Sequence, residues 1–118
     1  MGTENQRQFH RVEYPGAVQP RLVLQRPSDI ADVVCGVIDC SERGIRVSLP
    51  AGLSLTVGSA LSGTVTFARG ATVRVAGTIV WMRGGEAAIR LERTAGIPFR
   101  VIMDEQRYLR ARFVSADG

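Results

Sequence analysis

From Tyr14 onward the chain is built from short β-prone runs separated by turn residues, and this pattern limits it to a small set of folds. The runs cover residues 22–24, 30–38, 45–49, 63–67, 73–82 and 87–91. Residues 64–67 and 73–76 alternate apolar with polar side chains, which is typical of strands with one buried face and one wet face. Because no helical pattern separates the runs, we expect an antiparallel barrel or sandwich.

The C-terminal part of the chain has a helical pattern instead. Residues 104–113 begin with acidic residues, and arginines follow towards the end, which is the charge order that a helix dipole favours. Leu109 and Phe113 are four residues apart and would share one face of this helix. Residues 99–103 fit either a further strand or the first turns of the helix.

The length of 118 residues fits one domain. We expect a flexible N-terminal arm over residues 1–13, a barrel with a C-terminal helix over residues 14–113 and a tail over residues 114–118. The start of the chain is polar, unlike a signal peptide, and no apolar run reaches the roughly 18 residues of a membrane span. We therefore expect a cytoplasmic protein without membrane insertion. With a single histidine, Cys35 and Cys40 cannot complete a zinc site, and we expect reduced thiols and no metal.

The net charge of +4 comes entirely from arginine, because lysine is absent. A basic chain invites a nucleic-acid interpretation through counterion release. The excess lies in residues 51–118, which hold nine arginines and five acidic residues, whereas residues 1–50 hold six of each. Aromatic residues make up only 6% of the chain and do not interleave with the strands as stacking platforms, so we expect no DNA or RNA binding.

Two short motifs stand out among the polar residues. Arg7 and Arg11 form an Arg-x-x-x-Arg pair in the N-terminal segment, a spacing that arises readily by chance in an arginine-rich chain. Asp39, Ser41 and Gly44 form an Asp-x-Ser-x-x-Gly pattern between two predicted strands, which is far rarer. By itself the second motif fits a tight turn, in which Asp39 and Ser41 bond to backbone amides and Gly44 adopts a positive φ.

Catalytic chemistry fits the sequence poorly. His10, Asp39 and Ser41 have the side-chain types of a hydrolase triad, but no nucleophile elbow is present and His10 lies in the polar arm. No phosphate-binding loop, dinucleotide fingerprint or zinc-protease helix occurs in the sequence. We therefore expect a protein without enzymatic activity and without a cofactor.

Together the two motifs resemble the signature of the PilZ family, Arg-x-x-x-Arg followed about thirty residues later by Asp/Asn-x-Ser-x-x-Gly. The second motif begins 28 residues after Arg11, and both are complete. Residues 77–82 with Trp81, followed by residues 88–91, are similar to the family's later strand pair, although Ala88 stands where glycine is usual and Leu91 where phenylalanine is usual. The resemblance implies a six- or seven-stranded antiparallel β-barrel of the split type with a C-terminal helix. It also implies binding of cyclic di-GMP on the outer face of the barrel.

The resemblance assigns five ligand contacts. Arg7 and Arg11 would bond to guanine edges or phosphate oxygens through their planar guanidinium groups. Asp39 would accept hydrogen bonds from guanine N1–H and N2–H₂, and Ser41 would bond to a base or a phosphate. Gly44 would let the backbone approach the ligand closely.

Four further residues are weaker candidates for the same site. Arg43 and Arg46 flank the predicted turn and would add positive potential or stack on a base. Trp81 fits the edge of the site and the core equally well. Gln6 is neutral where family members that take a stacked ligand dimer tend to have a basic residue, so we expect one cyclic di-GMP per protein.

The preferred interpretation is a cyclic di-GMP receptor that orders its N-terminal arm on binding and signals to a downstream protein, as a monomer or weak dimer. A second interpretation is an adaptor of the same fold in pilus or envelope machinery that does not bind the nucleotide. Such family members usually lack a motif arginine, whereas Arg7 and Arg11 are both present here. A third interpretation is a small nucleic-acid-binding barrel.

Overall fold

The computed structural model describes residues 10–25, 33–53 and 55–114, and these contain seven strands. The strands are β1 (Val12–Glu13), β2 (Arg21–Gln25), β3 (Val33–Cys40), β4 (Gly44–Ser48), β5 (Ala60–Thr66), β6 (Thr72–Arg83) and β7 (Glu86–Leu91). Each predicted β-prone run overlaps one of β2 to β7. The strand β1 is an addition, and it lies within the segment that we expected to be the arm.

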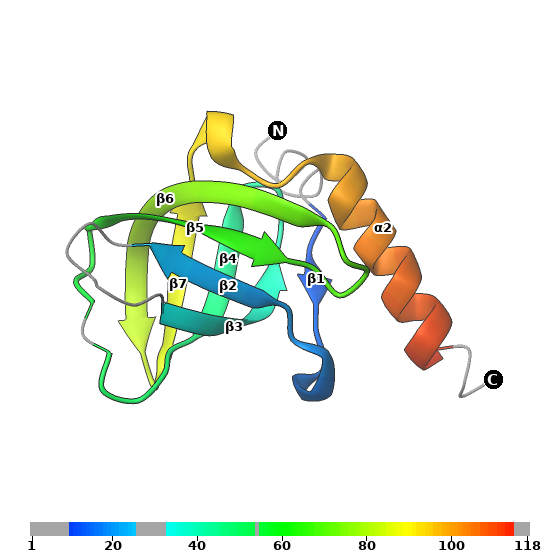
Figure 1. The fold of residues 1–118 in the computed structure, drawn as a ribbon, viewed down its shortest axis with the longest axis horizontal. Coiled ribbons are helices and arrows are strands. Elements are labelled where there is room, and N and C mark those ends of the chain that lie inside the picture. The colour runs from blue at the N-terminus through cyan, green and yellow to red at the C-terminus, as the bar shows by residue number, and fades with distance from the viewer. Residues whose placement is uncertain (1–9, 26–32, 54, 115–118) are drawn as a thin grey trace, which may run out of the picture.

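The strands form one antiparallel sheet that closes on itself (Figure 1). Neighbouring strands follow the order β1-β3-β2-β5-β6-β7-β4, and β3 also pairs with β4. Strands β2 to β7 therefore make a closed six-stranded barrel, and β1 is a short extra strand paired with the end of β3. The prediction of a six- or seven-stranded antiparallel barrel is confirmed.

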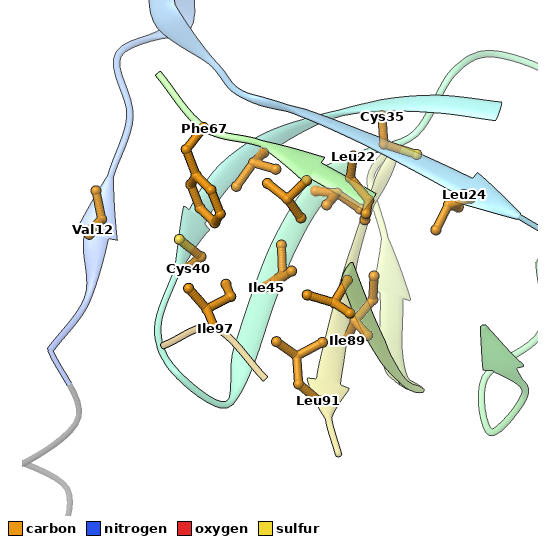
Figure 2. Packing of buried hydrophobic residues seen from close by; sticks show 14 of the residues in the cluster. Val12, Leu22, Leu24, Cys35, Cys40, Ile45, Phe67, Ile89, Leu91 and Ile97 are labelled. Atoms are coloured by element: carbon orange, nitrogen blue, oxygen red, sulfur yellow. The ribbon is translucent and has the colours of Figure 1, made fainter. Parts of the chain in front are cut away.

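Alternation along the strands fills the interior of the barrel with apolar side chains. On β4, Ile45 and Val47 are buried, whereas Gly44, Arg46 and Ser48 remain partly exposed. The same alternation on the other strands brings aliphatic side chains from every wall into one cluster, as Figure 2 shows. The opposite set of side chains is thereby left on the outer face, where a ligand can reach it.

The helix α2 (Phe99–Leu109) begins directly after Pro98 and continues into a short π-helical turn, η3 (Arg110–Val114). A proline suits this place because it has no N–H group that the first turn would leave unpaired. Residues 99–103, which fitted either a strand or a helix, thus belong to the helix. Two single 3₁₀ turns, η1 (Gly16–Val18) and η2 (Arg93–Ala95), complete the described helical structure.

The helix α2 is held against the barrel by Glu105, of which only 1% is exposed. The Tyr14 hydroxyl donates a hydrogen bond to Glu105 Oε1 at 2.5 Å. The backbone N–H groups of Ala68 and Arg69 donate to Oε1 and Oε2, each at 2.9 Å. One carboxylate therefore connects the helix to the turn after β5 and to the chain that leaves β1.

Two glycines of the β6–β7 hairpin set the register of these strands. Gly84 and Gly85 have φ values of 59° and 77°, a left-handed conformation that other residues rarely adopt. The hairpin pairs Arg83 with Glu86 and Ile79 with Ile89. Strands β6 and β7 thereby form one wall of the site described next.

Candidate functional site

A cavity of about 220 Å³ lies on the outer face of the barrel, next to β3, β4, β6 and β7. It brings together the described members of both sequence motifs and residues of the β6–β7 hairpin. Its lining consists of Arg11, Asp39, Ser41, Arg43, Gly44, Ile45, Arg46, Val80, Trp81, Ala88, Ile89 and Arg90. The four arginines face a single carboxylate in this lining, so the cavity favours an anionic occupant.

The register of β4 and β7 explains how the outer face acquires this chemistry. Gly44 lies opposite Arg90, and Arg46 lies opposite Ala88. All four residues are on the face that alternation turns away from the core. The two small residues leave room between the two arginines, and the cavity occupies this room.

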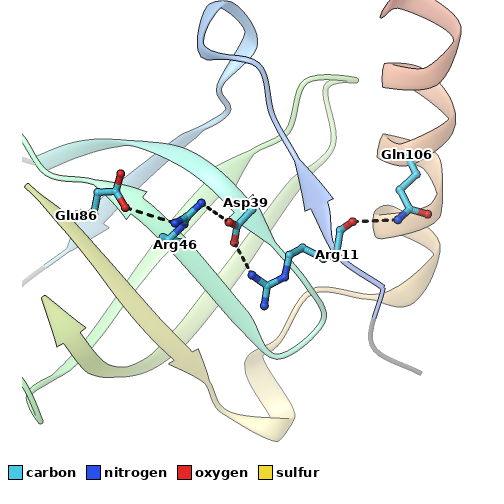
Figure 3. Close-up of polar contacts among 5 residues, drawn as sticks. All are labelled: Arg11, Asp39, Arg46, Glu86 and Gln106. Carbon is cyan, nitrogen blue, oxygen red and sulfur yellow. Dashed lines mark hydrogen bonds and ion pairs between the residues drawn. The ribbon is translucent and has the colours of Figure 1, made fainter. Parts of the chain in front are cut away.

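Asp39 lies at the centre of the polar contacts, as Figure 3 shows. Arg46 Nη2 is 2.9 Å from Asp39 Oδ2, and Arg11 Nη1 is 3.6 Å from Oδ1. Only 6% of the Asp39 side chain is exposed, compared with 62% for Arg11. A buried carboxylate is therefore paired on its Oδ1 side with a guanidinium that extends into solvent.

Arg46 is shared between two carboxylates. Besides Asp39, its guanidinium faces Glu86 of β7, with Arg46 Nη1 3.6 Å from Glu86 Oε1. Its Nε is buried and has no hydrogen-bond partner among the described residues. An unpaired buried donor costs free energy, so this N–H is available to an acceptor that enters the cavity.

The backbone at Arg11 is fixed even though its side chain is exposed. The Gln106 side chain of α2 donates from Nε2 to the Arg11 carbonyl oxygen at 3.1 Å. The preceding His10 ring lies 5.4 Å from the Phe99 ring, also on α2. His10 does not line the cavity, so the described geometry does not assemble the triad that His10, Asp39 and Ser41 suggested by residue type.

The turn between β3 and β4 carries the second motif. The Ser41 N–H donates to the Gly44 carbonyl oxygen at 2.8 Å, and the Leu91 N–H donates to the Arg43 carbonyl oxygen at 2.8 Å. These bonds attach the turn to the end of β7 and keep Ser41 at the cavity.

The predicted positive φ at Gly44 is wrong. Positive φ among the described glycines occurs at other positions, and Gly44 already belongs to the extended strand β4. A Cβ built at Gly44 would lie 3.7 Å from the Ile89 carbonyl oxygen and 3.7 Å from Ser41 Oγ, which is ordinary contact. The barrel itself therefore does not require glycine here, whereas the cavity gains space from it.

Trp81 lines the cavity and is only partly buried. A bulge explains its position, because the β6–β7 pairing jumps from Ile79↔Ile89 to Trp81↔Ala88 and leaves Val80 unpaired. Val80 is exposed and also lines the cavity. The Arg83 guanidinium lies 4.9 Å from the centre of the Trp81 ring, so one part of the indole is in contact with a cation.

The sequence prediction and the described cavity overlap incompletely. Gln6 and Arg7 lie outside the described residues. Arg90 lines the cavity, but neither motif includes it. The alternation of β7 could have indicated Arg90, because it stands between the buried Ile89 and Leu91 and must face outward.

Cys40 follows Asp39 in the sequence but points into the core. Burial raises the pKa of the Cys40 thiol to about 12, so the thiol is protonated at neutral pH. Within the described residues, no group of three metal-binding side chains occurs. The helices of that part of the chain are all too short or too polar to cross a membrane.

Comparisons with known proteins agree with this architecture. The profile of the PilZ domain matches residues 5–115. A solved structure, that of the inhibitor of motility MotI/DgrA from Bacillus subtilis, superimposes with a TM-score of 0.66 at 14% sequence identity. The alignment covers 92% of this chain and 51% of that one, so this chain spans about half the length of that protein. At such identity the likeness concerns the fold alone.

No curated protein matches the chain by sequence. The family assignment therefore depends on the profile, which extends over residues 5–115 and includes both motifs and every strand of the barrel. This coverage shows that the chain belongs to the PilZ domain family.

Proposed function

We propose that the chain is a receptor for cyclic di-GMP and that the cavity beside β4 and β7 is its binding site. The observation that carries the proposal is the lining of this cavity, where Arg11 of the first motif lies with Asp39, Ser41 and Gly44 of the second. These residues come from segments that are far apart in the sequence, and a turn motif alone would not need to bring them together. Membership in the PilZ domain family supports the same ligand.

The ligand has two kinds of group for these side chains. Its phosphates are anionic, and Arg11, Arg43, Arg46 and Arg90 surround the cavity with positive charge. Its guanines have adjacent N–H donors that only an acceptor can satisfy, and Asp39 is the carboxylate of the lining. Guanine also has O6 and N7 acceptors that match an arginine fork. A partly buried indole at Trp81 provides a surface on which a base can stack.

Residues before His10 would complete the site. Arg7 lies outside the described residues, and its contact with the ligand stays a prediction, as do the ordering of the arm on binding and the single ligand expected from Gln6. Signalling would follow if the bound state presented a different surface to a downstream protein. The helix α2 is a candidate for that surface because Gln106 already bonds to the backbone of Arg11.

Calorimetric titration with cyclic di-GMP tests the proposal. The wild-type protein should bind one ligand per chain, and Arg11→Ala should bind at least about tenfold more weakly, because a charge-assisted contact is lost. Arg100→Ala is the matched control, since Arg100 is an exposed arginine of α2 that does not line the cavity. Arg7→Ala extends the test to the other motif arginine.

Three outcomes would count against the proposal, either against its binding site or against the nucleotide itself. Equal titration curves for the wild type, Arg11→Ala and Arg7→Ala would show that the motif arginines do not contact the ligand. Absence of binding by a folded wild-type protein would favour the adaptor interpretation. Strongly salt-dependent binding of DNA or RNA, without any response to cyclic di-GMP, would favour the nucleic-acid interpretation.

A further inference from the structure

Four charged side chains in and beside the cavity form a row in which the sign of the charge alternates. Arg11 lies just before β1, and Asp39, Arg46 and Glu86 follow it on β3, β4 and β7, with successive contacts of 3.6, 2.9 and 3.6 Å (Figure 3). The first three line the cavity, whereas Glu86 stands outside the lining. Glu86 therefore reaches the site only through Arg46.

The sheet register accounts for this contact. Arg46 lies directly opposite Ala88, and Glu86 is two residues before Ala88 on the same face of β7. Diagonal neighbours of this kind are within reach of long side chains. Because Ala88 has only a methyl group, it leaves the path between Glu86 and Arg46 open.

The two carboxylates hold Arg46 with different strength. The contact to Asp39 is 2.9 Å long and involves a side chain that is 6% exposed. The contact to Glu86 is 3.6 Å long, and both side chains are 39% exposed. Water and salt screen the second contact far more than the first, so Glu86 is the partner that Arg46 exchanges more readily.

We propose that Glu86 competes with an anionic group of the ligand for Arg46 and thereby lowers the affinity of the site. This inference rests on the proposed cyclic di-GMP function. Glu86 holds the Nη1 group of Arg46, so a phosphate that draws this guanidinium into the cavity has to weaken the Glu86 contact. Glu86 is thus a positioning residue that acts through Arg46 and does not itself contact the ligand.

A Glu86→Gln substitution tests the competition by titration with cyclic di-GMP. Removal of an exposed ion pair should tighten binding by about two- to fivefold, the range that such pairs contribute. Glu92→Gln is the matched control because it removes the same charge from an exposed residue just beyond β7 that is outside the cavity lining. This control should leave the affinity unchanged.

Titration of Arg46→Gln, with and without the additional Glu86→Gln substitution, separates competition for Arg46 from a general change of charge. We expect Arg46→Gln to weaken binding and Glu86→Gln to have no further effect on it, which is the signature of coupled residues. Equal tightening in both backgrounds, or tightening by Glu92→Gln as well, would overturn the inference.

The result also distinguishes this inference from the proposed function. If the wild type binds cyclic di-GMP and Glu86→Gln binds it with the same affinity, the inference is wrong while the receptor function stands. If none of these folded proteins binds the nucleotide, both are wrong. Chemical denaturation of each variant shows whether it is folded under the titration conditions.

Discussion

Two buried carboxylates with different partners distinguish the proposed ligand site from the structural core of the protein. Asp39 is 4% exposed and Glu105 is 1% exposed, and they are the buried charged residues of the described chain. Burying a carboxylate is costly unless charges or hydrogen-bond donors compensate it. The protein compensates the two carboxylates in different ways.

Glu105 is compensated by neutral donors that the fold itself holds in position. Its partners are the Tyr14 hydroxyl and the backbone N–H groups of Ala68 and Arg69. Backbone donors cannot turn away without opening the turn that contains them. The contact therefore stabilises one arrangement of α2 against the barrel.

Asp39 is compensated by guanidinium groups on long side chains. Arg11 and Arg46 are 62% and 39% exposed, so both can change rotamer and accept another anion without disturbing the backbone. Burial of a charge therefore does not by itself mark a functional site. The freedom of its partners to move makes Asp39 the candidate for ligand binding.

A pair of isosteric substitutions gives the largest expected difference between the two regions. Glu105→Gln places an amide NH₂ against donors that need an acceptor, and should lower the free energy of unfolding by about 3 kcal/mol. Asp39→Asn leaves its arginine partners able to reach water, and should cost less than about 1 kcal/mol. Urea denaturation of the two variants measures both values.

Ligand titration should reverse this order. Asp39→Asn should lose at least about tenfold in affinity for cyclic di-GMP, because an amide offers guanine one acceptor oxygen in place of two. Glu105→Gln, under conditions where it is folded, should bind like the wild type. Equal losses of stability in the two variants would contradict the division between them.

Tyr14→Phe examines the structural side of the comparison by removing one donor to Glu105. Oε1 keeps its bond from Ala68, so we expect a smaller loss of about 1–2 kcal/mol in the free energy of unfolding. Affinity for cyclic di-GMP should not change, because Tyr14 does not line the cavity. A clear loss of affinity with an unchanged free energy of unfolding would show that Tyr14 contributes to ligand binding, and would contradict the division between the two regions.

Alkaline pH should weaken the core by a smaller amount. Burial raises the pKa of Cys40 to about 12 from its ordinary value of 9.0, and burial also raises the pKa of Tyr14. Above about pH 9 the unfolded chain loses the Cys40 proton while the folded chain retains it, so stability falls as pH rises. The slope for one such proton is at most about 1.4 kcal/mol per pH unit.

Urea denaturation of the reduced protein at pH 8 and pH 10 measures this decrease in the free energy of unfolding. The free energy of unfolding of Cys40→Ala should change less between the same two pH values. An identical slope in that variant would assign the decrease to other groups.

The strands were predictable because alternation is a local property of the sequence. The charge order indicated a helix in the C-terminal part but misplaced its start, because α2 begins at Phe99 and its first turn holds no acidic residue. Features that depend on the pairing of strands were not predictable. The bulge that turns Val80 and Trp81 towards the cavity results from the register of β6 against β7, which no local pattern specifies. The expected positive φ at Gly44 was wrong because Gly44 is already the first, extended residue of β4.

The burial of Glu105 was indicated by its position in the sequence, although its charge argued against it. It stands four residues after the buried Val101 and four before Leu109, which is the spacing of one helix face. Its acidity placed it at the expected start of the helix, whereas it lies in the middle of α2. Only the three donors supplied by distant segments make its burial possible.

Closure of the barrel also determines at which stage of folding a ligand can bind. The cavity is lined by residues from Arg11 to Arg90, so its last wall exists only after β7 has paired with β4. Contacts between such distant residues form late, because loop-closure entropy opposes them. A ligand of this cavity therefore selects chains that have already folded and protects them from unfolding, but it cannot guide the early steps of folding.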